Sequence, residues 1–173
     1  MSKAACALLA GMVVSATVVE RAVAQSPAPA TPAPANLGQL MKGTLYPASN
    51  VVFAAQDINP ADVPHAKDPS MATDLLASTF GKWQAVENSA LAITEVATLL
   101  TLPRKCANGV DVPLGNADWG KFVQELRDAG MVAYAAAQSK NQDKMIDAAD
   151  VMTKACQHCH LKYREKKAAD RCK

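Results

Sequence analysis

The chain has 173 residues, which is room for one compact domain with little left over for a second core. Half of its residues are hydrophobic and 20% are charged, and 18 Lys and Arg against 16 Asp and Glu give a formal net charge of +2. This balance disfavours a chain disordered by charge and a strongly polybasic nucleic-acid binder. An aromatic content of 5% with 8 Gly argues against a β-sandwich, and segments rich in Ala, Leu and Met indicate helices.

The N-terminal residues have the pattern of a secretory signal peptide. Lys3 supplies a positive charge, residues 4–19 are almost all apolar, and Ala22-Val23-Ala24 is a small-x-small cleavage signal. We therefore expect residues 1–24 to be removed on export to the periplasm, an oxidising compartment. The alternative is a membrane-anchoring helix, but the apolar run is shorter than the roughly 20 residues that span a bilayer. Residues 25–35 form an extended linker rich in Pro and Ala.

Two helices are predicted after the linker. The first covers residues 36 to about 56, and Pro47 is expected to kink it or to split it near Gly43. The second begins at residue 68, where an N-cap Asp precedes a Pro, and ends before Pro103. Its apolar positions are spaced by three and four residues and are Leu76, Phe80, Trp83, Val86, Ala90, Ile93, Ala97 and Leu100.

Two further helices follow in the second half of the chain. One runs from about residue 116 to 138 and the other from about 141 to 167, with a short turn between them. The segments 57–67 and 103–115 are rich in Pro, Asn, Asp and Gly, so they are predicted loops. Four amphipathic helices without a convincing alternating strand predict an all-α domain over residues 36–173, an antiparallel four-helix bundle.

The most informative residues are Cys156-Gln157-His158-Cys159-His160, a C-x-x-C-H sequence. This spacing is the attachment signature of c-type haem. Two thiols three residues apart on one helical turn can add to the two vinyl groups of one porphyrin, and the following His can bind the iron. The pattern therefore predicts one haem c and its iron, held by Cys156, Cys159 and His160.

Three other interpretations of these residues are open. A C-x-x-C redox pair needs a thioredoxin-like βαβ setting, which the sequence does not indicate. A zinc site would need a fourth ligand besides Cys156, Cys159 and His160, such as Cys172 or Cys106, and it lacks a second closely spaced ligand pair. A disulfide between Cys156 and Cys159 would close a strained helical loop. Haem is favoured over all three.

The chain resembles the class II c-type cytochromes, the cytochrome c-prime family. The resemblance rests on an exported, mostly helical chain whose C-x-x-C-H sequence lies near the C-terminus, within CQHCHLKYR at residues 156–164. It implies a four-helix bundle with thioether bonds from both cysteines of the motif. It also implies that His160 is the proximal iron ligand and that Arg164 lies near the proximal face.

Members of this family differ on the distal side of the iron. Six-coordinate, low-spin members use a Met from the first helix, whereas an apolar residue leaves the iron five-coordinate in the c-prime members. By resemblance, LGQLMK at residues 37–42 matches this first-helix segment and Met41 matches the ligand, with Leu37 where the family usually has an Arg. Met41 is therefore a candidate distal ligand, and ordinary packing of its side chain in the core is the alternative.

These observations predict a periplasmic mono-haem cytochrome that transfers single electrons and is not an enzyme. The expected partner is a redox protein of the periplasm. We expect no binding to nucleic acid and contact with a membrane only through the export signal. The chain could also form a homodimer. The basic residues near the C-terminus are expected to stabilise the C-terminal end of the last helix, where positive charge is favourable. The alternative is that they form a docking patch for an acidic redox partner. One alternative function is the binding of nitric oxide or carbon monoxide by a five-coordinate haem. Another is that of an accessory subunit of a periplasmic dehydrogenase or oxidase.

The remaining cysteines, histidines and aromatic residues have simpler expected roles. Cys106 and Cys172 could pair in an oxidising compartment or stay as free or intermolecular thiols. His65 and His158 are expected to face solvent. Tyr46 is expected to be half-buried instead of acting as an oxygen ligand. The aromatic residues that could pack around a porphyrin are Trp83, Trp119, Phe122 and Tyr134.

Overall fold

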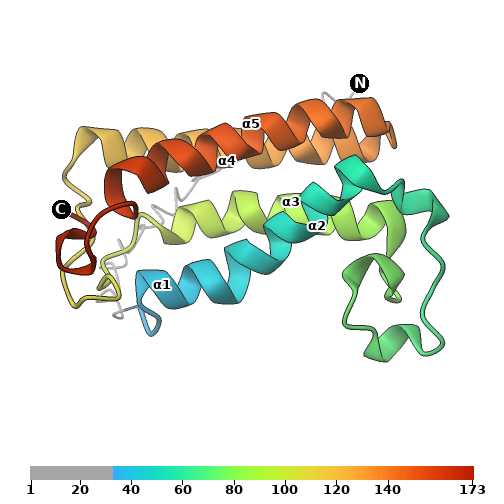
Figure 1. Ribbon diagram of the computed structural model, residues 1–173, viewed down its shortest axis with the longest axis horizontal. Coiled ribbons are helices and arrows are strands. Elements are labelled where there is room, and N and C mark those ends of the chain that lie inside the picture. Colours follow the sequence, from blue (N-terminus) through green and yellow to red (C-terminus); the bar gives the residue numbers. More distant parts are fainter. Residues whose placement is uncertain (1–32) are drawn as a thin grey trace, which may run out of the picture. The chain divides into compact units, whose positions relative to one another are not determined.

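The computed structural model describes residues 33–173 and shows an all-α protein (Figure 1). A short α1 (Leu37–Leu40) comes first, and no β-strand occurs within the described residues. The predicted signal peptide at residues 1–24 and most of the predicted linker at 25–35 lie outside the described residues. The four long helices are α2 (Tyr46–Asp57), α3 (Lys82–Leu99), α4 (Ala117–Gln138) and α5 (Gln142–Tyr163).

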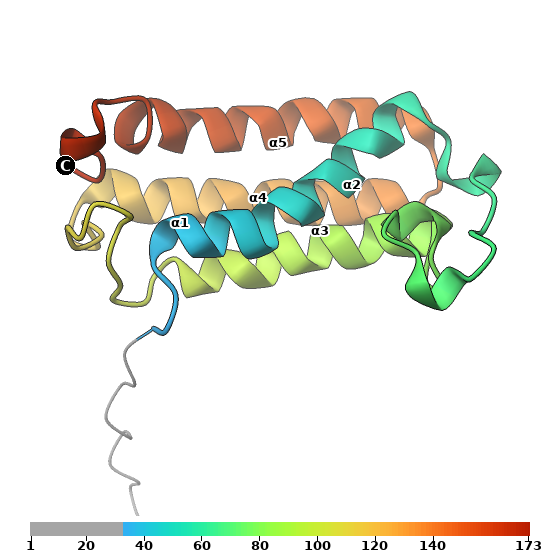
Figure 2. The ribbon, with the colours of Figure 1, turned by 60° about the horizontal axis from the view of Figure 1, so that its bottom comes forward.

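The long helices pack side by side around one apolar core. α3 contacts α4, α4 contacts α5, and α2 contacts both α3 and α5, so each helix has two neighbours. Figure 2 shows α3, α4 and α5 with nearly aligned axes and α2 crossing them obliquely. No helix within residues 33–173 is both long and apolar enough to cross a bilayer. The largest fully buried side chains include Val52, Val86, Ile93, Met145 and Met152.

The first predicted helix is interrupted by a π-turn, Met41–Leu45, which lies between α1 and α2. At the end of this turn the N–H of Tyr46 donates to Met41 O, five residues back, instead of making the α-helical bond. Pro47 has no N–H to continue the α-helical pattern, and its ring would clash with the carbonyl of Gly43 four residues back. The break predicted near Gly43 is therefore present, and it places a non-α-helical turn at Met41.

The second long helix begins at Lys82, so the predicted start at Asp68 was wrong. The Asp68 side chain does cap a helix, but only the 3₁₀ turn Pro69–Met71. A second 3₁₀ turn, Leu75–Ala77, follows and is capped by an Asp of its own. Capping by short polar side chains competes with a continuous helix, which explains the two short turns. Phe80, which was predicted in the core, is consequently 64% exposed.

The last helix, α5, ends at Tyr163 and not at the predicted residue 167, because the chain folds back there. The N–H of Glu165 donates to His160 O at 2.8 Å and closes the last turn. The tail then returns toward the helix, so that the N–H of Cys172 donates to Tyr163 O at 3.1 Å. The predicted starts of α4 and α5 are confirmed to within about a residue.

Candidate cofactor site

A cavity of about 560 Å³ lies between the start of α1 and the end of α5. Figure 1 shows that α1 begins and α5 ends at the same end of the helices. Residues from all five α-helices, the π-turn, the loop before α4 and the C-terminal tail line it. The volume and the apolar lining are typical of a small-molecule or cofactor site. Its apolar walls include Ile93, Leu100, Trp119, Phe122, Leu126 and Met152.

The last turns of α5 bring the C-x-x-C-H residues to the wall of this cavity. Cys156, Cys159 and His160 all line it, and each is half-buried. Both sulfurs are free thiols that pack against the core. The cysteines lie on one helical turn, as their spacing of three residues requires. The three residues predicted to hold a haem therefore share one apolar space.

Burial raises the pKa of both thiols. The pKa of Cys159 rises to about 11, first because of burial and then because Cys156 and two nearby carboxylates disfavour the thiolate. Burial also raises the pKa of Cys156, against a smaller opposite effect of the Arg164 charge. A C-x-x-C redox pair needs a thiol of lowered pKa in an electropositive setting. The direction of both pKa shifts is opposite to that requirement.

The His160 imidazole is neutral at pH 7. Burial lowers its pKa below the ordinary value, the positive charge of Arg164 lowers it further, and Glu165 acts in the opposite direction. A neutral ring can offer a nitrogen lone pair to a metal ion. Arg164 also lines the cavity, and its guanidinium forms an ion pair with the Glu165 carboxylate. The structure therefore places Arg164 beside the predicted proximal ligand.

Met41 is the first residue of the π-turn and lines the same cavity as His160, but from a different helical segment. Its side chain is half-buried and packs against the core. Two apolar neighbours, Leu37 and Leu45, also line the cavity. One space therefore contains a thioether sulfur and an imidazole, the two types of axial ligand that hold the iron in many c-type cytochromes.

The aromatic residues predicted around a porphyrin divide into two pairs. Trp119 and Phe122 line the cavity, whereas Trp83 and Tyr134 do not and belong to the packing of the core. A stripe of apolar residues faces the core along the whole length of a helix, but the cavity occupies only one end of the molecule. Trp83 lies at the start of α3, and the cavity lies near Leu100 at the other end of that helix.

Neither of the other histidines lines the cavity. His65 Nδ1 lies 3.0 Å from Ser78 O, and His158 Nδ1 lies 2.9 Å from the Glu125 carboxylate, with both rings exposed. The prediction that they face solvent is confirmed. Tyr46 lines the cavity but is 66% exposed, so the expected half-burial was wrong. A residue that lines the cavity and is largely exposed lies at the open edge of the cavity, and Tyr46 has this position at the start of α2.

The two spare cysteines, Cys106 and Cys172, form a disulfide, with their Cα atoms 6.6 Å apart. Of the alternatives open from the sequence, pairing is therefore the one observed. Because each sulfur is bonded to the other, neither is a thiolate that could complete a zinc site with the residues of the motif. Within residues 33–173, no three His, Cys, Asp or Glu side chains are grouped closely enough to hold a metal ion.

Reasoning from the sequence missed the contribution of the C-terminal tail to this cavity. Ala168, Arg171 and Cys172 line it, together with Ala107 and Asn108 of the loop before α4. No local pattern marks these residues, since the tail and the loop are some 60 positions apart in the chain. The available signal was the pair of spare cysteines, because a bridge between them brings the tail to the loop.

A polar contact at the cavity rim joins α4 to α5. The Tyr163 hydroxyl donates to Asp118 at 2.5 Å and accepts from Asn116 at 3.2 Å. The Tyr163 ring packs edge-on against Trp119, with ring centroids 5.1 Å apart. Lys162 Nζ lies 3.4 Å from the second carboxylate oxygen of Asp118. The hydrogen bond from Tyr163, and then the contact with Lys162, hold the pKa of Asp118 below its ordinary value.

Asp118→Asn is expected to reduce the loss of stability in acid. A carboxyl with a depressed pKa stabilises the folded protein above its ordinary pKa of 3.8, and this contribution is lost as the pH falls through the folded value. In the native protein the free energy of unfolding should therefore decrease once the pH is lowered below about 4. In the variant this decrease should be smaller. Denaturant unfolding at about pH 6 and about pH 3.5 measures the difference.

The matched control is Asp147→Asn. Asp147 is an exposed carboxyl of α5 whose side chain makes no hydrogen bond or ion pair within the described residues. This variant should lose stability in acid as the native protein does. Equal acid dependence in the native protein and Asp118→Asn would show that the contact with Tyr163 does not stabilise the fold.

Helical folds of this kind carry many functions, so the function rests on the chemistry of the cavity residues. The motif thiols, the neutral imidazole and the thioether of Met41 lie on one apolar space, and the disulfide holds the C-terminal tail beside them. No protein-family model matches the chain, and no curated protein or solved structure is significantly similar to it.

Proposed function

We propose that the chain is a class II c-type cytochrome that carries one haem c in the periplasm and transfers single electrons. The observation that carries the proposal is the cavity of about 560 Å³ on whose wall Cys156, Cys159 and His160 lie together with Met41. The protein is then a carrier and not an enzyme, and its partner is a periplasmic redox protein. Denaturing gel electrophoresis of the exported protein, followed by staining for peroxidase activity, tests whether haem stays bonded to the chain.

The chemistry of the cavity residues fits a haem c. Two free thiols on one helical turn can supply both thioether bonds, and the neutral imidazole of His160 can supply an axial nitrogen. The aromatic and aliphatic walls suit the apolar faces of a porphyrin. When bound, the haem iron supplies the one-electron couple between its ferric and ferrous states. Within residues 33–173, Cys156 and Cys159 stay unpaired while the other two cysteines are bonded, which agrees with their use in attachment.

The residues around the site favour the reduced state. His160 and Met41 would hold the iron, and a Met ligand raises the reduction potential. The apolar walls would disfavour the additional positive charge of the ferric state. The positive charge of Arg164, which lies beside His160, disfavours the ferric state in the same way. We therefore expect a higher reduction potential than that of a solvent-exposed haem.

The packing of the helices supports a four-helix bundle, the fold that the family resemblance implies. The first helix of this bundle would be α2 with the π-turn and α1 before it, and α3, α4 and α5 would be the other three. Each long helix contacts two others, and the short turn between α4 and α5 is typical of antiparallel neighbours. A cofactor site between facing helices is common in such bundles.

Met41→Ala is expected to convert a low-spin absorption spectrum into a high-spin one and to let carbon monoxide bind readily to the reduced protein. Alanine has no atom that can donate to iron, so the variant loses the distal ligand. Spectra of oxidised, reduced and carbon-monoxide-treated protein measure the change. Met145→Leu is the matched control, because Met145 is fully buried but does not line the cavity, and it should remain low-spin.

Two results would reject Met41 as a ligand. One is an unchanged spectrum in Met41→Ala. The other is a native protein that is already high-spin and binds carbon monoxide. The second result would assign the alternative function, a five-coordinate haem protein that binds nitric oxide or carbon monoxide, because the apolar side chains of Leu37 and Leu45 beside Met41 would leave the iron open.

A further inference from the structure

We propose that Arg171 binds a carboxylate of the porphyrin and is held at the cavity by a disulfide-tethered strap, which we define as residues 164–173. The inference rests on the proposed function, since it requires that the cavity holds a haem. A haem is an apolar disc that carries two carboxylates. These groups need water or cations, because burying an unpaired carboxylate is very costly.

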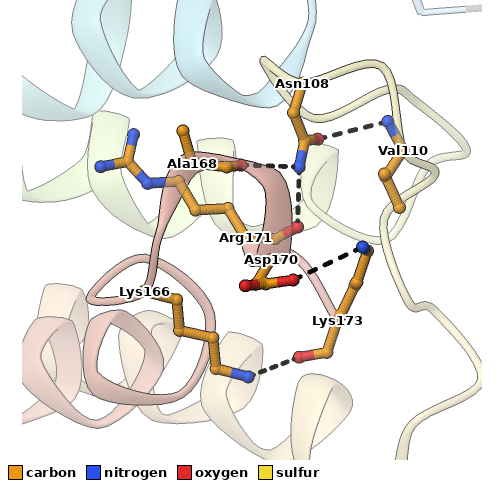
Figure 3. A network of polar contacts seen from close by, with 7 residues as sticks. All are labelled: Asn108, Val110, Lys166, Ala168, Asp170, Arg171 and Lys173. Carbon is orange, nitrogen blue, oxygen red and sulfur yellow. Dashed lines mark hydrogen bonds and ion pairs between the residues drawn. The ribbon is translucent and has the colours of Figure 1, made fainter.

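The strap is anchored to the loop before α4 on both sides of Arg171. Cys172 is bonded to Cys106, and the Asn108 amide donates to Ala168 O at 3.0 Å and to Arg171 O at 3.1 Å. Figure 3 shows the Asn108 amide reaching both carbonyls of the strap. These anchors join parts of the chain that are about 60 residues apart. The backbone that carries Arg171 therefore has one defined position.

Contacts with the end of α5 hold the strap and one nitrogen of the Arg171 guanidinium. The N–H of Cys172 donates to Tyr163 O at 3.1 Å. Cys172 has a φ of +65°, in the left-handed region that residues other than Gly adopt only when their surroundings impose it. Arg171 Nε donates to Arg164 O at 3.1 Å. This bond fixes the Arg171 guanidinium beside the last turn of α5, next to the cavity.

The two terminal nitrogens of Arg171 remain for a ligand. Within residues 33–173 they take part in no hydrogen bond and no ion pair. The nearby charges form other ion pairs, since Arg164 pairs with Glu165 and Lys173 pairs with Asp170. The Arg171 charge helps to lower the pKa of Glu165, behind the larger effects of Arg164, but the two side chains form no ion pair. In Figure 3 the Arg171 guanidinium points away from the pair of Asp170 and Lys173. A planar guanidinium with two unused nitrogens can bind one carboxylate through two parallel hydrogen bonds.

The position of Arg171 suits the carboxylate edge of a porphyrin. Three cations line the cavity, namely Lys42, Arg164 and Arg171, and Arg171 is exposed to solvent. Lys42 is a flexible point charge on the π-turn, and Arg164 already has a carboxylate partner. Arg171 is therefore the cation of this rim that is both fixed in place and unpaired.

The haem-loaded full chain tests this proposal through the pKa of the haem carboxylates. Infrared redox difference spectra recorded as a function of pH follow these groups directly. Arg171→Gln is expected to raise the pKa of one haem carboxylate by about one unit or more, since an opposite charge within about 4–6 Å lowers a carboxyl pKa by about 1–3 units. Lys167→Gln removes the same charge from the same strap at a residue that does not line the cavity, and it should change the pKa much less.

The double variant Cys106→Ser/Cys172→Ser tests the role of the tether. It should reproduce the shift of Arg171→Gln, and the triple variant should add nothing further, because both changes remove the same contact. An unshifted carboxylate pKa in Arg171→Gln, or an equal shift in Lys167→Gln, would overturn the inference and leave the proposed function intact. A native chain without covalent haem would reject the proposed function and the inference with it.

Discussion

Replacing Cys156 and Cys159 together by Ser is expected to abolish all haem staining of the denatured chain. A serine hydroxyl does not add to a vinyl group as a thiol does, so neither thioether bond forms. The native protein should stain for peroxidase activity after denaturing electrophoresis, whereas the double variant should show no stained band. Each single variant keeps one thiol on the cavity wall and should stain more weakly than the native protein.

The matched control for this experiment comes from the same chain. Cys106→Ser/Cys172→Ser also removes two sulfurs, but it removes them from the disulfide and not from the motif. This control should stain as the native protein does. Staining that survives in the Cys156 and Cys159 double variant would place the attachment elsewhere and contradict the proposed function.

Removing the disulfide is expected to lower the free energy of unfolding by about 4 kcal/mol. The bond joins residues 66 positions apart, and the chain-entropy model gives about 4 kcal/mol for closing a loop of that length in the unfolded chain. Urea unfolding of haem-loaded Cys106→Ala/Cys172→Ala should therefore show a much lower midpoint than the native protein. The same change releases the strap, so the stability loss should be accompanied by the carboxylate shift expected for Arg171→Gln.

A control in the same loop is Lys105→Gln. It breaks an exposed ion pair in which Lys105 Nζ lies 2.8 Å from Asp111, with side chains 59% and 76% exposed. Such pairs contribute about 1 kcal/mol or less, so the unfolding midpoint should move little. A mass measurement that finds two free thiols on the haem-loaded native monomer would show that the disulfide is absent.

The features that could be predicted from the sequence are local. The starts of α4 and α5 follow from apolar spacing, and the Asn141 side chain caps α5. The motif on α5 places Cys156, Cys159 and His160 together because three-residue spacing is one helical turn. The break near Gly43 also has a local cause. Pro47 has no N–H to donate, and its ring would clash with the carbonyl of the residue four positions back in a regular α-helix.

The features that could not be predicted depend on competition between alternative local structures or on contacts between residues that are far apart in the chain. The second helix starts late because two Asp side chains stabilise short 3₁₀ turns, and spacing alone does not reveal which structure is more stable. The place of Arg171 depends on contacts with Asn108 and Cys106, far away in the chain. Of the four aromatic candidates, only tertiary packing decides which ones reach the cavity.

The group that is bonded to the exported protein decides whether the chain is a c-type cytochrome. The measurement is mass spectrometry of the proteolytic peptide that contains Cys156 to His160, prepared from the exported protein without reduction. We predict one porphyrin bonded to this peptide through both sulfurs, together with a separate disulfide-linked peptide pair that contains Cys106 and Cys172. A peptide that contains two free, alkylatable thiols and no porphyrin would contradict the claim that the protein is a c-type cytochrome.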